Sequence, residues 1–419
     1  MHALFRVSWN YSRVLPYSST CRHPETRGTV SFTAELRRQE PGVSITFPPL
    51  PLSHPPPPQT TYSEPSTMSK KPFDPSTLQA FGNAAAGHDG VLSDESGAVV
   101  VKPCTASEIA FYESISASHP DLAPHLPTFM GQLSLSSSQP AATGESSTTV
   151  TVDGAIERLH GKKLDTELHI VLENITHGFT KPNVLDLKLG AQLWDEAAKP
   201  EKRVRLDKIS AETTSGSLGF RIAGMRVYKG EPVPGTPEGL KESVEADEGS
   251  GYWVYNKMYG RKLAAEEVNE GFESYIHGQG KQGKELERAR EVLAYFLGEV
   301  KDITKAFENK ESRMYSASIL LVYEGDVDAY ARTKERLRSA PAGEEGDEEE
   351  DLPQLAAVKM IDFAHATWTP GQGPDENALR GMRSTTAILK DLLDSVEKEF
   401  HAAEEASRPV AASLFCSSV

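Results

Sequence analysis

Hydrophobic residues along the chain follow two different periods, which predict both strands and helices. Residues 98–102, Ala-Val-Val-Val-Lys, form a short β-branched run typical of a strand. Residues 168–172 form a second apolar run that leads into a polar turn and also predicts a strand. In segments 284–309 and 384–403 the large apolar side chains recur three or four positions apart, which is the spacing of one helix face. We therefore expect buried strands together with long amphipathic helices.

The first 70 residues lack such a pattern, and we expect a disordered, proline-rich leader. Residues 55–58 are four consecutive prolines, a composition that favours polyproline II. Arginines without acids in the first 24 residues weakly resemble a mitochondrial transit peptide, but the prolines and weak amphipathicity argue against that targeting. Met68 is an alternative start, because folded-looking sequence begins soon after it.

Several later segments read as connections. Residues 133–150 are rich in serine and threonine and predict a loop, whereas the charged segment 195–212 predicts a helix. Residues 326–352 interrupt two predicted strands and contain an acidic run, which we interpret as a solvated insertion. Residues 406–419 form a tail.

Composition excludes several classes of function. The 419 residues carry a formal net charge of −16, which argues against a general nucleic-acid-binding surface. The three cysteines lie far apart without metal-ligand spacing, so we expect reduced thiols in an intracellular protein of the nucleus, the cytoplasm or both. No apolar run reaches the length of a membrane span.

Residues 182–190, Pro-Asn-Val-Leu-Asp-Leu-Lys-Leu-Gly, are the most informative for chemistry. Asp186 and Lys188 are two positions apart, so in an extended segment both side chains emerge on one face. A carboxylate and an ammonium held in this way can handle a sugar hydroxyl and a phosphate together. The alternative is a plain surface salt bridge at a strand end.

This P-x-x-x-D-x-K-x-G segment resembles the signature of the inositol polyphosphate kinase family, and four further matches follow in the family's order. They are Ser217–Tyr228 (S-L-G-F-R-I-A-G-M-R-V-Y), Tyr315–Gly325 (Y-S-A-S-I-L-L-V-Y-E-G), Lys359–His365 (K-M-I-D-F-A-H), and Gly373–Glu376 (G-P-D-E) followed by Gly381. Ala317 and Ile319 depart from the family's S-S-L-L pattern. The resemblance covers residues 80–400 approximately.

The resemblance implies an α+β, two-lobed kinase-like fold. We expect a small lobe with an antiparallel sheet at residues 71–176 and a larger catalytic lobe at 177–405, with ATP and Mg²⁺ between them. The glycine-bearing turn at residues 82–90 is either a cover for the nucleotide phosphates or an ordinary hairpin turn.

By the same resemblance, Lys102 and Glu108 form the pair that holds the α- and β-phosphates of ATP, within a K…E-x-x-F-Y arrangement. Backbone groups of Glu173 and Ile175 would face the adenine edge. Asp362 ends a predicted buried strand and would bind Mg²⁺, a hard ion that takes oxygen ligands.

Three further residues are predicted around the transferred group. Lys188 would bind substrate phosphate and the transferring phosphoryl group, and Asp186 would either bind the ribose or position the acceptor hydroxyl. Ser318 either assists the nucleotide or metal site or satisfies a neighbouring backbone group.

A basic cluster directly after the signature is the predicted site for the phosphates of the acceptor. Its members are Lys199, Lys202, Arg203, Arg205 and Lys208. Arg221, Lys257 and Arg261 are further candidates. The alternative reading of the cluster is a solvated helix face.

We therefore expect a monomeric enzyme that transfers phosphate from ATP to soluble inositol polyphosphates. The short segment between Gly190 and Leu218 favours a multikinase that takes tris- and tetrakisphosphates toward pentakisphosphate. The alternatives are a hexakisphosphate kinase that forms pyrophosphates and a non-catalytic scaffold that binds protein partners through the leader or the acidic run. A protein kinase is disfavoured, because no H-R-D loop or D-F-G triplet is present.

Overall fold

The computed structural model describes residues 77–85, 90–135, 149–152, 155–158, 164, 166–339 and 354–407. These residues all belong to one unit, Lys71–Val419. The predicted leader, residues 86–89 of the predicted glycine turn, residues 136–148 of the predicted serine- and threonine-rich loop, the acidic run and the tail beyond residue 407 lie outside the described residues.

The smaller of the two main sheets is antiparallel, with the strand order β1-β2-β3-β7-β4. Its strands are β1 (Gln79–Ala80), β2 (Leu92–Ser93), β3 (Val99–Pro103), β4 (Phe129–Ser134) and β7 (Leu168–Glu173). Helix α1 (Ala106–Ser118) follows β3, and the Thr105 hydroxyl caps it by accepting the Glu108 N–H at 3.2 Å. The predicted strands at 98–102 and 168–172 are therefore confirmed. A 3₁₀ turn (Pro120–His125) and the hairpin β5 (Thr149–Val152) and β6 (Ala155–Arg158) complete this part.

The larger sheet has the order β10-β11-β9-β8-β13-β14, and all its described pairs are antiparallel. Its strands are β8 (Pro182–Leu189), β9 (Phe220–Tyr228), β10 (Val244–Asp247), β11 (Tyr252–Tyr255), β13 (Ser318–Glu324) and β14 (Ala356–Ile361). The signature segment forms β8, between β9 and β13. The predicted lobe boundary at residue 176 falls between the last strand of one sheet, β7, and the first of the other, β8.

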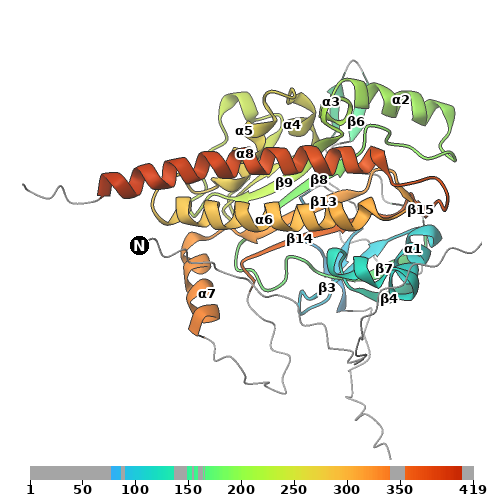
Figure 1. The fold of residues 1–419 in the computed structure, drawn as a ribbon, viewed down its shortest axis with the longest axis horizontal. Helices are drawn as coiled ribbons and strands as arrows, with labels where there is room; N and C mark the ends of the chain where they lie inside the picture. Colours follow the sequence, from blue (N-terminus) through green and yellow to red (C-terminus); the bar gives the residue numbers. More distant parts are fainter. Residues whose placement is uncertain are drawn as a thin grey trace, which may run out of the picture. The chain divides into compact units, whose positions relative to one another are not determined.

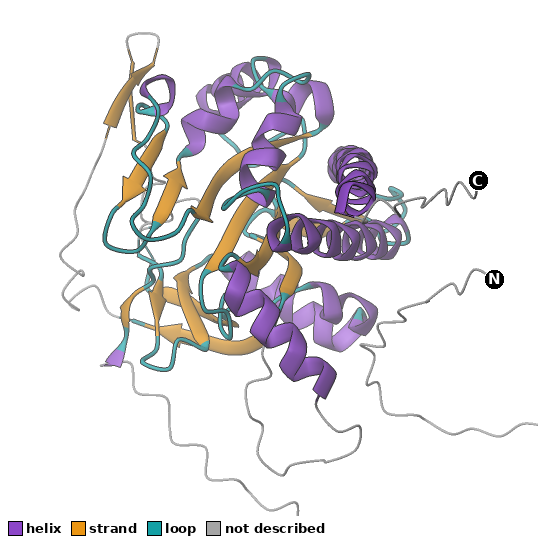
Figure 2. Ribbon diagram, turned by 90° about the vertical axis from the view of Figure 1, so that its left-hand side faces the viewer, coloured by secondary structure: helices purple, strands orange, loops and turns teal. Residues whose placement is uncertain are grey.

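Two long helices, α6 (Lys284–Glu308) and α8 (Glu376–Ser407), run side by side along the larger sheet (Figure 1). Seen almost end-on in Figure 2, they lie to one side of its strands. Leu185, Leu187 and Leu189 of β8 are completely buried in the core to which these helices contribute. The helix predicted at 284–309 is thus confirmed. Helix α8 begins eight residues before the start at 384 that the hydrophobic spacing indicated, at the G-P-D-E segment that resembles the family's helix start.

The early start of α8 has a local cause. The Asp375 carboxylate accepts the Ala378 N–H at 3.1 Å, as a helix cap does, and also the Met314 N–H at 2.6 Å. Met314 belongs to β12 (Ser312–Met314), which pairs with β15 (Ala366–Trp368). The hydrophobic period alone did not indicate this capped first turn.

The remaining helices are short and follow the strands of the larger sheet. They are α2 (Pro200–Ala211), α3 (Thr214–Leu218), α4 (Lys257–Lys262), α5 (Val268–Ile276), α7 (Val327–Ser339) and a 3₁₀ turn at Glu238–Leu240. Helix α2 begins five residues later than predicted, and α7 was not predicted. In the part of the chain that the structure describes, no helix is long and apolar enough to cross a membrane.

A β-bulge interrupts the pairing of β8 with β9 between Asp186 and Leu187. Before the bulge Asp186 lies opposite Gly224, and after it Lys188 lies opposite Arg221. Because side chains alternate between the faces of a sheet, the extra residue exchanges the faces of the residues that follow it. Arg221 therefore lies opposite Lys188, where unbroken pairing would place Ile222.

Three glycines from separate sequence motifs meet where β8 and β9 approach α8. The Gly190 N–H donates to the Gly219 carbonyl at 2.7 Å. A Cβ atom at Gly381 would lie 2.2 Å from the same carbonyl oxygen, and one at Gly219 would lie 2.9 Å from the Gly381 nitrogen. These backbones pack more closely than any side chain allows, which explains the glycines in three of the motifs.

We expect Gly381→Ala to lower the free energy of unfolding by roughly 2–3 kcal/mol, because the new methyl group meets backbone atoms that cannot yield cheaply. Urea-induced unfolding measures the change. The matched control is Gly298→Ala in α6, where a Cβ atom has nothing within 4 Å. That variant should gain roughly 0.5–1 kcal/mol from helix propensity. Equal effects of the two substitutions would contradict the close packing.

Candidate active site

Strand pairing brings three separate motifs together on one face of the larger sheet. Lys188 of β8 is the register partner of Ser318 in β13, and Ser318 is the partner of Ile361 in β14. Asp362 follows Ile361 directly. Asp186 and Lys188 share the face opposite to that of the fully buried leucines of β8, as the sequence predicted. The D-x-K, serine and I-D-F segments are therefore neighbours.

Lys102 of β3 connects the smaller sheet to this group. Its Nζ lies 2.9 Å from Glu108 Oε1 and 2.6 Å from Asp362 Oδ1. Although burial alone would lower the pKa of Lys102, the carboxylates of Asp362 and Glu108 raise it, so this lysine is held as a cation. The structure contains the predicted Lys102–Glu108 pair and adds Asp362 as a second partner.

Asp362 has an unusual backbone conformation, with φ of 67°. Aspartate tolerates this left-handed region better than most residues. The next residue, Phe363, is fully buried and stacks on Phe111 of α1 at 4.7 Å between ring centroids. The segment after β14 is thus fixed to α1 by aromatic packing and to β3 by the Asp362–Lys102 ion pair.

A magnesium ion bound by Asp362 would need most of its ligands from outside the protein. The described residues contain no group of three or more His, Cys, Asp or Glu side chains that could hold a metal ion. Magnesium in phosphotransferases commonly takes one or two carboxylates, with waters and substrate phosphates in the other positions. Asp362 therefore remains the predicted metal ligand.

Cations gather around the buried carboxylate of Asp186, which is 4% exposed. Burial lowers the pKa of Lys188; Asp362 and Asp186 oppose this change, whereas Arg221 and Lys102 add to it. Burial lowers the pKa of Arg221 to about 10, and the nearby Arg261 adds to this effect while Asp186 opposes it. Lys188 and Arg221 are register partners close to Asp186, and Arg261 is near enough to Arg221 to influence its pKa. We call Lys188, Arg221 and Arg261 the cationic cluster; such a concentration of positive charge suits a ligand with several negative charges.

Arg221 is further fixed by a hydrogen bond from Nη1 to the Ser215 hydroxyl at 2.8 Å. Lys188 donates from Nζ to the Ser316 carbonyl at 3.1 Å. Ser318 is fully buried, and its hydroxyl has no hydrogen-bond partner among the described residues. Both predicted roles of Ser318 stay open.

Ile175, which is predicted to face the adenine edge, follows the last strand of the smaller sheet and belongs to a small apolar cluster, here called the hinge cluster. Its buried members are Ala85, Ile175, Val184, Val322 and Ala357. The Glu173 N–H donates to the Thr128 carbonyl at 3.0 Å, and the Glu173 carboxylate accepts from Thr128. An adenine contact at Glu173 would therefore use its carbonyl rather than its N–H. The roles of Glu173 and Ile175 stay predictions.

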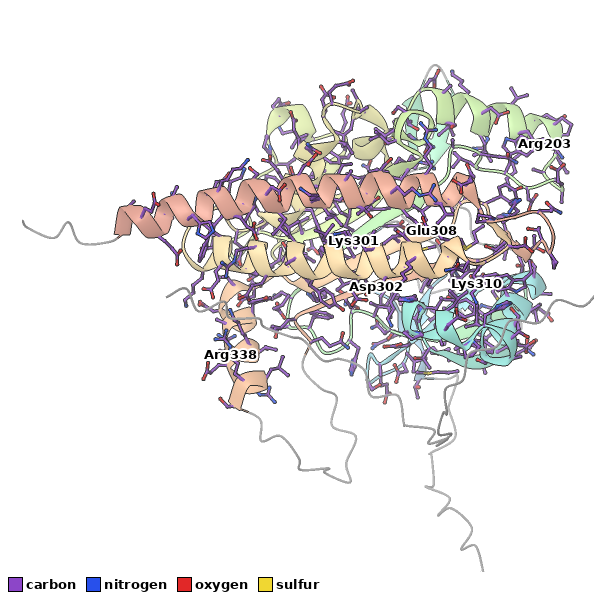
Figure 3. The ribbon with its side chains drawn as sticks, in the orientation of Figure 1. Arg203, Lys301, Asp302, Glu308, Lys310 and Arg338 are labelled. Carbon is purple, nitrogen blue, oxygen red and sulfur yellow. The ribbon has the colours of Figure 1, made fainter. Side chains whose placement is uncertain are left out.

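The basic residues predicted to bind the acceptor occupy different environments on α2. Arg203 donates to the carbonyls of Ala198, at 2.8 Å, and Glu196, and lies over the Trp194 ring at 4.6 Å from its centroid. Figure 3 shows Arg203 beside the segment that precedes α2. Its guanidinium is thus engaged in holding this segment.

The other cations of α2 are more accessible. Lys199, Lys202 and Arg205 are exposed, and Lys208 lies 3.8 Å from Glu212, one turn along the chain. Lys199, Lys202, Arg203 and Lys208 stay predicted phosphate ligands, and the contacts of Arg203 add a structural role.

One close pair was not predicted from the sequence. His365 Nδ1 lies 2.6 Å from Asp195 Oδ2, and this contact joins the loop after β14 to the segment after β8. The two residues are 170 positions apart, and no local pattern marks Asp195 as a partner. Such a pair becomes visible only when the strand order is known.

Two sheets joined by a lysine with two carboxylate partners, beside a cationic cluster, define a two-lobed protein of the kinase-like class. Comparison with known proteins agrees. A family model described as inositol polyphosphate kinase matches residues 169–390.

Similar proteins include two fungal enzymes named inositol polyphosphate multikinase. The one from Saccharomyces cerevisiae is 31% identical over 349 residues, which cover 73% of this chain and 96% of that protein. The one from Schizosaccharomyces pombe is 29% identical and covers 75% of this chain and 98% of that protein. Rat inositol hexakisphosphate kinase 1 is 28% identical, with 57% of this chain and 55% of that protein covered.

A solved structure of the S. cerevisiae multikinase in complex with ADP and Mn²⁺ matches with a TM-score of 0.52 at 30% identity, covering 71% of this chain and 100% of that one. The chain belongs to the inositol polyphosphate kinase family. The family and fold class expected from the sequence motifs are therefore confirmed.

We expect Lys102→Met to lower the free energy of unfolding by roughly 3 kcal/mol, because Glu108, which is 1% exposed, then lacks its cation. Adding Glu108→Gln should recover part of this loss, since the uncompensated carboxylate is gone. Thermal and urea unfolding of the single and double variants measure both steps. A Lys102→Met protein as stable as wild type would contradict this account of the ion pairs.

Proposed function

We propose that the protein is an ATP- and Mg²⁺-dependent kinase that phosphorylates soluble inositol polyphosphates, taking tris- and tetrakisphosphates toward pentakisphosphate. The observation that carries this proposal is the cationic cluster, next to the Lys102–Asp362 ion pair. The Lys102–Asp362 ion pair suits the nucleotide phosphates, and the cationic cluster suits a polyphosphate acceptor. The multikinase structure with ADP and Mn²⁺ supports the choice of nucleotide and divalent metal.

The residues divide the work of phosphoryl transfer among them. The hinge cluster offers an apolar surface for adenine, and Lys102, positioned by Glu108, neutralises phosphate charge. Asp362 would hold Mg²⁺, which supplies further charge neutralisation when bound. Lys102 and Asp362 are in contact, so the groups proposed to bind the phosphates and the metal ion lie together.

Lys188 belongs to the cationic cluster and is close enough to Asp362 and Lys102 to feel their charges, so it is suited to the charge on the transferring phosphoryl group. Arg221 and Arg261, together with Lys199 at the N-cap of α2 and Lys202 and Lys208 within it, would bind the phosphates of the acceptor. Asp186 either orients the acceptor hydroxyl or binds the ribose. Positioning of the hydroxyl suffices, since a loose transition state requires little general base catalysis.

The choice of substrate rests on the relatives and on the segment that follows the signature. The multikinase alignments span nearly the whole of those proteins, at 96% and 98%, whereas the rat hexakisphosphate kinase alignment spans 55%. Between Gly190 and Phe220 the chain forms only the short helices α2 and α3. This compact segment favours the multikinase.

The direct test incubates the full chain with Mg-ATP and either inositol 1,4,5-trisphosphate or inositol hexakisphosphate, followed by anion-exchange separation of the products. We expect stepwise conversion of the trisphosphate to tetrakis- and pentakisphosphate. Product from the hexakisphosphate alone would replace the multikinase by a pyrophosphate-forming kinase. Folded protein that binds ATP but converts neither would favour the scaffold.

We expect Lys188→Ala to lower kcat by roughly 100-fold or more, because the transferring group loses its cation. The unfolding temperature should change little. Lys390→Ala, which removes an exposed lysine of α8, is the matched control and should keep wild-type turnover. Near wild-type turnover of Lys188→Ala would remove this lysine from the mechanism.

The pKa of Lys188 predicts an alkaline limit of activity. Burial holds this pKa below the ordinary value of 10.5, so Lys188 loses its proton, and kcat falls, at a lower pH than for an exposed lysine. A Lys188→Arg variant keeps its charge, and its residual activity should not show this fall. Turnover measured from neutral to alkaline pH compares the two proteins. Identical alkaline limits would assign the fall to another group.

A further inference from the structure

Ser316, in the turn before β13, has a backbone conformation that serine rarely adopts. Apart from glycine, only Ser316 (φ 61°) and Asp362 (φ 67°) have positive φ among the described residues. Ser316 precedes β13 and Asp362 follows β14, and the two strands pair at this end through Ser318 and Ile361. Both unusual residues therefore lie at the active-site end of these strands, where backbone strain commonly has a functional reason.

The hydroxyl and the carbonyl of Ser316 connect the segment after β8 with the site. Its hydroxyl donates to the Leu193 carbonyl at 3.1 Å, and its own carbonyl accepts from Lys188 Nζ at 3.1 Å. The hydroxyl bond fixes the turn to the segment after β8. The residue with the left-handed backbone is therefore the one whose carbonyl accepts the hydrogen bond from the Lys188 ammonium.

The anchor of Ser316 is itself fixed. The Asn377 Oδ1 atom in the first turn of α8 accepts the N–H groups of Ala191 at 2.9 Å and Gln192 at 2.8 Å. Its Nδ2 atom donates to the Gln192 carbonyl at 3.0 Å. A continuous path of hydrogen bonds and backbone thus runs from α8 through residues 191–193 and Ser316 to Lys188.

We propose that Ser316 is a positioning residue for catalysis: its left-handed backbone, anchored at Leu193, holds the ammonium of Lys188 in place for the transferring phosphoryl group. A lysine side chain has four rotatable bonds and a compact charge, so a fixed acceptor restricts where that charge lies. The inference rests on the proposed kinase function. It adds a residue that does not itself need to touch the substrate.

Two substitutions separate the hydroxyl anchor from the backbone conformation. Ser316→Ala removes the anchor and leaves a residue that disfavours positive φ, so the turn should relax and release Lys188. Ser316→Gly also removes the anchor, but glycine adopts positive φ without steric cost. We expect kcat to fall roughly tenfold or more in the alanine variant and clearly less in the glycine variant. The KM for ATP should stay unchanged in both.

The same pair of substitutions at Ser339, an exposed serine that ends α7, is the matched control and should leave kcat unchanged. Thermal unfolding of every variant shows whether the fold is retained. A general loss of folding would lower the unfolding temperature and the active fraction of a variant. It would not make Ser316→Gly more active than Ser316→Ala when both have the same active fraction.

Asn377→Ala provides an independent measurement, because it loosens the segment that anchors Ser316. We expect it to lower kcat as well. The double variant with Ser316→Ala should have a kcat no lower than that of the less active single variant. Multiplying losses would show that the two residues act separately and would overturn the proposed path.

The experiments distinguish the proposed kinase function from the positioning role of Ser316. Wild-type protein that phosphorylates no inositol phosphate would overturn the proposed function, and this inference with it. Active wild type with unchanged kcat in Ser316→Ala, or with glycine no better than alanine, would overturn the positioning role alone.

Discussion

The ion pairs of Lys102 are the interaction on which the site depends. This single ammonium, carried by the smaller sheet, contacts Glu108 at the start of α1 and Asp362 after the last strand of the larger sheet. Partly buried charges are costly unless they are compensated, so the two sheets are constrained to present these groups to one another. The stacking of Phe111 on Phe363 fixes the same junction with apolar surface. Charge and packing together hold the motifs of the two sheets in fixed positions relative to one another.

The larger sheet divides its two faces between stability and chemistry. The fully buried leucines of β8 belong to the main core, whereas Asp186 and Lys188, between them in sequence, face the site. With unbroken alternation, Ile222 of β9 would lie opposite Lys188. The bulge between Asp186 and Leu187 shifts the pairing by one residue and places Arg221 opposite Lys188 instead. A local irregularity of one residue thus completes the cationic cluster.

Much of this organisation was predictable from the sequence, because periodicity marked α6 and the strands, and ordered motifs marked the family. The pair formed by Lys102 and Glu108 was predicted by resemblance to the family's K…E-x-x-F-Y arrangement, because a lysine near an acid on neighbouring elements is by itself a weak signal. The contact of His365 with Asp195, the face of Arg221 and the role of Ser316 depend on strand order, a bulge and a φ angle. None of these leaves a local pattern of polar and apolar residues. Arg203 stays a predicted ligand, and its contacts with the segment before α2 add a structural role that its charge alone did not indicate.

The register of β13 with β14 has a consequence for how the chain can change during evolution. Pairing is continuous from Ser318 with Ile361 to Tyr323 with Ala356, so the sheet itself keeps the serine and I-D-F segments together. The connection between these strands leaves from the end opposite to the site and includes α7. Closing a longer connection costs little, roughly 0.6 kcal/mol for each doubling of its length. Insertions in this connection can therefore be gained, lost or altered in charge during evolution while the residues of the site stay in place. The connection can acquire new binding partners in this way, and selection for phosphoryl transfer acts on a different part of the sheet.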